Sequence, residues 1–185
     1  MGSVATSVAQ TELLMFYDEW SRRYQDRLRG LTQAEYDWEP VPGAWSVRTT
    51  PDGAQVERVE PDPDPPPVTT IAWRMWHIAI ECLEGYAARV FGTTATDLED
   101  RAFTLDVDEA IDITARAAGG FRAALVAQGP DWLFEQLGPT YGPYAEATYL
   151  GLTLHVIDEL VHHGAEVALL RDLYAASPGG QARRA

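Results

Sequence analysis

The stretch LHVIDELVHHGAE, residues 154–166, holds three of the chain's four histidines together with three carboxylates. At about 100° per residue of an α-helix, positions 155, 159 and 163 advance by only about 40° at each step. His155, Glu159 and His163 therefore form one polar stripe, whose sector also contains His162 and Glu166. Such a stripe is typical of a metal site, of an acid–base site, or of a helix that is merely polar on one side.

Apolar residues are expected on both flanks of this stripe. The opposite side of the helix carries Ile157, Leu160, Val161 and Ala168, and it is apolar enough to be core. The sector beside the stripe is also partly apolar, through Leu169, Leu170 and Leu173. A simple surface helix has one apolar side. The pattern therefore predicts that the polar stripe lines an internal cavity.

Four segments of the chain carry the helical period of apolar residues. They run over about 11–29, about 70–91, 106–128 with Asp106 as N-cap, and from a start after Pro143 to 174. The apolar positions of the first and third segments recur at helical spacing: Leu13, Tyr17, Trp20, Tyr24 and Leu28, then Val107, Ala110, Ile111, Ala117, Phe121 and Leu125. We expect an all-α fold, a four-helix bundle, in a single domain over 1–174 with a flexible tail over 175–185.

A long irregular segment separates the first two of these helices. It starts with a short helical piece, in which Thr32 and Glu35 have the spacing of a capping box. Its prolines then exclude a helix, and the turn sequence PDG would join two short strands, VRTT and QVERVE, in a hairpin. The acidic, proline-rich stretch Glu60–Pro67 reads as a solvated loop.

Composition limits the classes of function. The net charge of −14 disfavours nucleic acid as a partner, because phosphate neutralisation needs a cationic surface. The chain has no lysine, which excludes Schiff-base chemistry, and its single cysteine, Cys82, is consistent with a reducing cytosol. Neither a signal peptide nor a membrane span is indicated. We therefore expect a soluble cytoplasmic protein.

The residue types in the stripe suit a metal ion. Glu159 and His163 are four residues apart on a helix, so both can reach one ion. The one histidine outside the stretch is His77, and the set His77, Glu159 and His163 would leave open positions for water or substrate. The alternative is that His77 is a packed, hydrogen-bonded core histidine. On the same spacing Cys82 lies off the face of His77, as a small buried side chain.

Other charged residues of the stripe also have a structural interpretation. Glu166 is either solvated or paired with Arg171, five residues further on. Glu159 either ligates an ion or bonds one of the histidines directly, which would leave a polar cluster without a metal.

Three stretches resemble the DinB/YfiT-like superfamily of small four-helix-bundle proteins. LTQAEYDWEPVPGAWSVR (31–48) resembles the segment after the family's first helix. WRMWHIAIE (73–81) resembles its second-helix signature, and HVIDELVHHGAEVALLRDLY (155–174) its fourth-helix signature. The likeness covers roughly residues 11–174. It implies the family's helical-bundle fold.

The resemblance also implies a divalent metal ion, zinc or nickel, with one ligand on helix two and two on helix four. These positions fall on His77, Glu159 and His163, although the family more usually has histidine where Glu159 stands. His155 matches an optional upstream histidine, and Glu166 replaces the usual glutamine. With His162, these two would be second-shell partners or proton carriers.

Characterised relatives include thiol transferases that use bacillithiol or mycothiol, and a mycothiol-dependent isomerase. The resemblance therefore implies a metal-dependent transferase that acts with a low-molecular-weight thiol of the mycothiol type. Alternatives are a metal-dependent hydrolase, and a non-catalytic small-molecule-binding or stress-related homodimer with a vestigial metal site. A homodimer is expected in each case.

Overall fold

Four long helical rods make up the fold. The computed structural model describes residues 2–61, 63–92, 103–129 and 131–182. The rods are α1 (Gly2–Leu28), a composite second rod, α5 (Val107–Ala127) and α6 (Tyr149–Ala176). The second rod runs without a break through α3 (Ile71–Trp76), η1 (His77–Gly85) and α4 (Tyr86–Phe91). The predicted all-α four-helix bundle is therefore confirmed.

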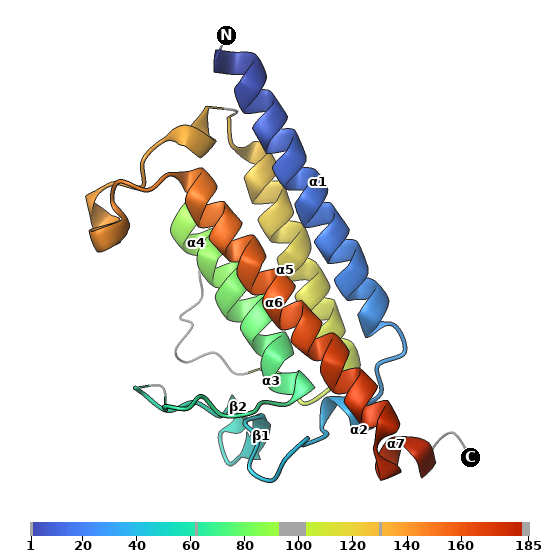
Figure 1. Cartoon of the computed structure of the whole chain (residues 1–185). Coiled ribbons are helices and arrows are strands. Elements are labelled where there is room, and N and C mark those ends of the chain that lie inside the picture. The colour runs from blue at the N-terminus through green and yellow to red at the C-terminus, as the bar shows by residue number, and fades with distance from the viewer. Residues whose placement is uncertain (1, 62, 93–102, 130, 183–185) are drawn as a thin grey trace.

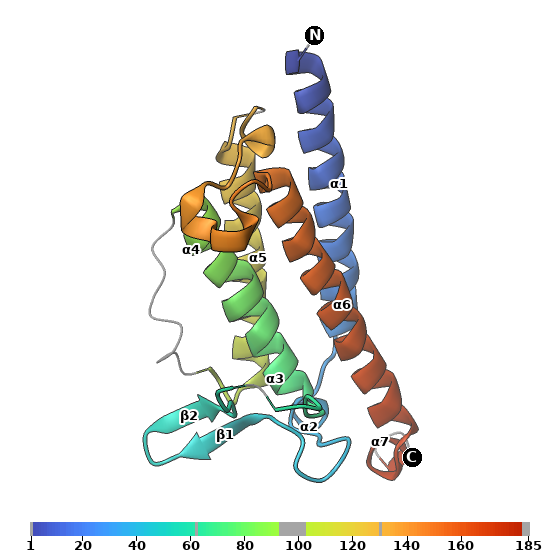
Figure 2. The same cartoon turned by 60° about the vertical axis from the view of Figure 1, so that its left-hand side comes forward.

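The rods are arranged as a bundle in which each contacts two neighbours (Figures 1 and 2). α1 lies against α5 and α6, and the composite rod lies against the same two helices. α1 and the composite rod therefore occupy opposite corners. This arrangement lays α6 alongside the rod that carries His77, so residues about 80 positions apart in sequence face each other.

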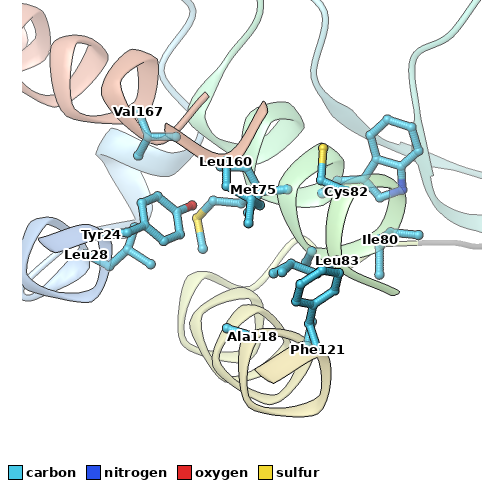
Figure 3. Close-up of a cluster of buried hydrophobic side chains, with 14 of the residues drawn as sticks. Tyr24, Leu28, Met75, Ile80, Cys82, Leu83, Ala118, Phe121, Leu160 and Val167 are labelled. Atoms are coloured by element: carbon cyan, nitrogen blue, oxygen red, sulfur yellow. The ribbon is translucent and has the colours of Figure 1, made fainter. Parts of the chain in front are cut away.

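Side chains from all four rods meet in one core, as Figure 3 shows. The five apolar residues that the spacing of the first segment predicts to share a face are all buried, as are five of the six predicted for the third segment. The labelled members come from α1 (Tyr24, Leu28), the composite rod (Met75, Ile80, Cys82, Leu83), α5 (Ala118, Phe121) and α6 (Leu160, Val167). Helical periodicity was therefore sufficient to locate the core faces.

Helix ends follow from their capping residues. Thr70 and Asp106 accept hydrogen bonds from the backbone N–H groups of Trp73 and Glu109, as predicted for the starts of the second and third segments. α1 begins at Gly2, earlier than the expected start near Thr11. Beyond α6 a short helix, α7 (Pro178–Ala182), covers part of the expected tail, whose last residues, 183–185, lie outside the described residues.

The segment between α1 and the composite rod contains the predicted hairpin. After α2 (Gln33–Tyr36), which begins with the expected capping box, β1 (Val47–Thr50) pairs antiparallel with β2 (Gly53–Val56). The second strand starts and ends earlier than QVERVE would place it. The backbone of Trp45 bonds both Val68 and Thr70, so this segment is fastened to the start of α3, where the hairpin lies in Figures 1 and 2.

Two short 3₁₀ helices, η2 (Trp132–Phe134) and η3 (Pro139–Tyr144), connect α5 with α6. None of the described helices is both long and apolar enough to cross a membrane.

Candidate metal centre

The middle of the composite rod is a π-helix rather than an α-helix. It covers His77–Gly85, nine residues that sequence periodicity assigned to a continuous α-helix. In an α-helix, residues five apart point about 140° away from each other. In a π-helix the hydrogen bond joins residues i and i+5, which brings them onto one side. The wider turn therefore puts both Glu81 and Cys82 on the side of His77.

His77 is held in one orientation by its neighbours. Its Nδ1 lies 2.6 Å from Glu81 Oε2, and its ring stacks on Trp73 with centroids 5.4 Å apart. Glu81 is held in turn by Arg58, at 2.5 Å. The other ring nitrogen, Nε2, lies 4.0 Å from Glu159 Oε2 on α6. This Nε2 is buried and has no hydrogen-bond partner among the described residues.

His163 on α6 has a matching environment. Its Nδ1 lies 2.7 Å from Glu166 Oε2, and its Nε2 lies 3.1 Å from Glu159 Oε2. Arg74 Nε bonds Glu166 at 2.8 Å, while Arg74 Nη1 lies 3.2 Å from His163 Nδ1. A guanidinium only donates, so the Arg74 contact would need a bare Nδ1 on His163, whereas the contact to Glu166 needs a protonated one. Because the contact to Glu166 is the shorter, we assign the proton of His163 to Nδ1, with Arg74 bonded to the carboxylate.

The two histidines therefore present equivalent nitrogens to a common point. Each donates its Nδ1–H to a carboxylate, an arrangement that orients histidine ligands in metal sites, and each directs Nε2 toward Glu159. Their ring centroids are 4.5 Å apart. The ligand atoms of a tetrahedral ion with bonds of about 2.0–2.2 Å lie about 3.3–3.6 Å apart. The observed distances from Glu159 to the two histidine nitrogens, 3.1 and 4.0 Å, bracket this spacing, so each histidine is placed to share an ion with Glu159.

Histidine and arginine partners lower the pKa values of the two carboxyl groups that contact the histidines, Glu81 and Glu166. Burial alone would raise the pKa of Glu81, but the hydrogen bond and charge of His77 and the charge of Arg58 hold it below its usual value. The same balance, with His163 and Arg74 as partners, lowers the pKa of Glu166. Both carboxylates are therefore charged acceptors at neutral pH.

Cys82 belongs to the same centre. A ligand atom from each of His77, Cys82 and Glu159 lies within 4.8 Å of the others. Burial, followed by the charges of Glu159 and Glu81, raises the pKa of the Cys82 thiol to about 12. Cys82 is buried, as predicted, but the prediction that it lies off the face of His77 was wrong, because that prediction assumed α-helical spacing.

The remaining residues of the polar stripe have separate partners. Glu166 pairs with Arg74, not with Arg171, which bonds Glu35 instead. His162 is exposed, and its Nε2 is 3.4 Å from Glu166. His155 Nε2 lies within hydrogen-bond distance, 2.9 Å, of the Tyr86 hydroxyl. Of these three residues, Glu166 has the shortest contact with a predicted ligand, through His163 Nδ1.

Several apolar residues beside the polar stripe are more exposed than predicted. Leu170 is buried, but Leu169 and Leu173 are 57% and 46% exposed, and Val161 is 39% exposed. The polar stripe is therefore not enclosed on both sides by buried apolar residues of α6, as an internal cavity would require. It faces the composite rod, because α6 packs against α3 and η1 along this side.

A small pocket borders the centre at His77. Its volume is about 170 Å³, and it is lined by Trp45, Arg58, Pro63, Pro66, Pro67, Thr69, Trp73, Arg74, His77 and Glu81. Three of these residues come from the acidic, proline-rich stretch that was expected to be a solvated loop. The described residues of that stretch are mostly exposed, as expected, and three of its prolines also line this open pocket.

Sequence reasoning did not include Arg74 in the site. It precedes His77 by three residues, the spacing at which helical side chains share a face. That signal was present within WRMWHIAIE, but the partner carboxylate, Glu166, is 92 residues away and only the packing of α6 on α3 brings it near.

Two histidines and a glutamate from two facing rods lie close together in this four-helix bundle. The chain is therefore a helical-bundle protein with a candidate metal site. The profile of the DinB superfamily matches residues 15–167. The chain belongs to the DinB superfamily, as the three resembling stretches indicated. Comparisons with curated proteins and with solved structures find no match.

Proposed function

We propose that the protein binds one divalent metal ion, zinc or nickel, through His77, Glu159 and His163. We further propose that it is a transferase acting with a low-molecular-weight thiol of the mycothiol type. The observation that carries the metal site is the buried Nε2 of His77, which has no partner among the described residues and lies 4.0 Å from Glu159.

A polar cluster without an ion would not satisfy this nitrogen. Glu159 lies 3.1 Å from His163 Nε2, but with the proton of that ring on Nδ1 this nitrogen is a lone pair, which a carboxylate cannot satisfy. The Nε2 of His77 is likewise unpaired, and an unsatisfied buried polar group costs about 1–3 kcal/mol. Moving Glu159 toward His77 would not change this, because both groups would still be acceptors. An ion between the three groups satisfies all of them, which is why we favour metal binding.

The chemistry that follows is the activation of a thiol. A divalent ion lowers the pKa of a coordinated thiol and so supplies a thiolate at neutral pH. Glu81 and Glu166 keep the Nδ1 protons in place, so that each Nε2 is a lone-pair donor. The pocket beside His77 offers apolar walls from prolines and tryptophans, with the guanidinium groups of Arg58 and Arg74 at its edge. His162, exposed beside Glu166, is placed to exchange protons with solvent.

The test separates the transferase from its alternatives. Protein purified without an affinity tag is loaded with zinc or nickel and assayed for consumption of an electrophile with and without a small thiol, and for ester and amide cleavage without thiol. We expect thiol-dependent turnover that falls by at least about tenfold in Glu159→Ala. Thiol-independent cleavage by the loaded protein would identify a hydrolase instead. Loaded protein with neither activity would support a non-catalytic binding protein.

A further inference from the structure

We propose that Cys82 is a fourth, sulfur ligand of the ion held by His77, Glu159 and His163. This inference rests on the proposed metal site and extends it to a residue that α-helical spacing excluded. It changes the donor set from two nitrogens and one oxygen to two nitrogens, one oxygen and one sulfur.

Cys82 lies close to two of the proposed ligands. The Sγ of Cys82 lies in a group with ligand atoms of His77 and Glu159, all within 4.8 Å of one another. Figure 3 shows Cys82 at the edge of the core cluster, with its sulfur directed away from Leu83 and Phe121. The thiol is 2% exposed, so it reaches this group from inside the bundle and not from solvent.

The local backbone brings Cys82 to this group. His77 and Cys82 are five residues apart and would diverge on an α-helix, but both lie within the π-helix His77–Gly85. A π-helix is rare and is frequently found at functional sites. Here it places a metal-ligand side chain near a nitrogen of His77, a residue whose Nε2 is buried and without a partner among the described residues.

The chemistry of a thiol suits this position. A cysteine ligates as the thiolate, so Cys82 would release its proton to solvent as the ion binds. The negative charge is compensated by the dication, beside Glu159 and two neutral imidazoles, and a substrate thiol would then add as a fifth ligand, a coordination number that catalytic zinc can reach. A soft sulfur ligand favours zinc, nickel or cobalt over magnesium and manganese. Cys82 would therefore help to decide which metal the centre accepts.

Cobalt(II) gives a direct test, because Cys82 is the chain's one cysteine. Untagged protein is titrated with cobalt(II) in thiol-free buffer while the near-ultraviolet absorbance is recorded. We expect an intense thiolate-to-cobalt charge-transfer band that saturates at about one ion per chain. In Cys82→Ser, the band should be lost while cobalt still binds. Cobalt bound to the wild type without this band overturns the Cys82 proposal and leaves the other three ligands standing. No bound cobalt overturns the metal site itself.

A second measurement addresses metal preference. Zinc and manganese affinities are compared between the wild type and Cys82→Ser, after circular dichroism has established that the variant is folded. We expect the zinc Kd to rise by at least about tenfold and the manganese Kd by less than about threefold. Equal changes for both metals would contradict sulfur ligation. Should Cys82→Ser not fold, the wild-type cobalt spectrum alone decides the question.

Discussion

A histidine nitrogen becomes a ligand when the other nitrogen of the ring carries the proton. In this protein two acidic residues, Glu81 and Glu166, hold that proton on His77 and His163. Each carboxylate is held by an arginine, Arg58 or Arg74, so the orientation of both rings depends on an ion pair one layer further out. Removal of a second-layer charge should therefore weaken metal binding even though no ligand is lost.

Glu81→Gln tests this dependence. An amide is a weaker acceptor than a carboxylate and no longer pairs with Arg58, so the His77 ring should be less firmly oriented and less basic. We expect zinc affinity to fall about 10–100-fold, as measured by competition with a chelator. Glu12→Gln, an exposed position on α1, is the matched control and should bind as the wild type does. Unchanged affinity in Glu81→Gln would show that the ring is fixed by packing on Trp73 alone.

Glu35 should make stability depend on pH. It caps α2 and bonds Arg171 of α6; burial would raise its pKa, but the bonds from Arg171 and Thr32 lower it below the usual 4.5. The unfolded chain therefore binds this proton more readily, so the stabilisation is complete above about pH 4.5 and is lost as the pH falls through the lowered folded-state pKa.

The Glu35→Gln variant checks the sign of this effect. At about pH 7 it should reduce the free energy of unfolding by about 1–3 kcal/mol, because a charged hydrogen-bond partner is replaced by a neutral one. The difference from the wild type should shrink in urea titrations at about pH 3. A difference that stays constant over this range would mean that the charge of Glu35 contributes nothing.

The sequence predicted the two ends of the composite rod but not the type of helix at its centre. Its start at Thr70 and its end near Phe91 follow from a cap and from helical periodicity, and both were predicted. The π-helix at its centre was not. Apolar periodicity assumes about 3.6 residues per turn, and no residue type in HIAIECLEG signals a wider turn. This segment packs against both α5 and α6, and such tertiary contacts are not encoded in a single helical pattern.

The site was accordingly predicted in part. His77, Glu159 and His163 were selected from spacing and from family resemblance, and the structure brings them together. Cys82 required the wider helical turn, and the Arg74–Glu166 pair required the packing of two rods. The exposure of Leu169 and Leu173 likewise depends on which neighbours α6 has, and a single helix pattern does not contain that information.

Thr70 starts the rod that carries His77, so its side chain should matter for stability. Its hydroxyl accepts from Trp73 N–H and donates to Ser46, and the residue is fully buried. Thr70→Val keeps the shape but removes both bonds, and we expect a loss of about 1–3 kcal/mol in the free energy of unfolding in urea. Thr49→Val, at an exposed position of β1, is the control and should change stability by less than about 0.5 kcal/mol. Equal effects would argue against the cap.

At the scale of the whole molecule, α1 packs closely against α6 along one side of the bundle. A side chain at Gly164 would meet Trp20 Nε1 at 3.1 Å and Tyr24 at 3.3 Å, while Trp20 donates to the carbonyl of Leu160 at 2.7 Å. Gly164 therefore permits a close contact one residue after His163. A larger residue here would push α1 away from the helix that carries two of the three proposed ligands.

Gly164→Leu should destabilise the fold by about 1–3 kcal/mol, measured by thermal or urea unfolding, because overpacking forces neighbouring side chains to move. Gly119→Leu on α5 is the matched control, since no described atom lies within 4 Å of a side chain there. The control should be neutral or slightly stabilising, because glycine is unfavourable inside a helix. A tolerated leucine at 164 would contradict the close packing of α1 on α6.

The metal content of the protein shows whether His77, Glu159 and His163 share one ion. Untagged wild-type protein and His77→Ala are equilibrated with zinc, freed of excess metal, and analysed for metal per chain. We predict about one ion per chain in the wild type and a loss of most of it in His77→Ala, with both proteins folded. Wild-type protein without bound metal, or His77→Ala with the same content as the wild type, would mean that these three residues do not hold an ion.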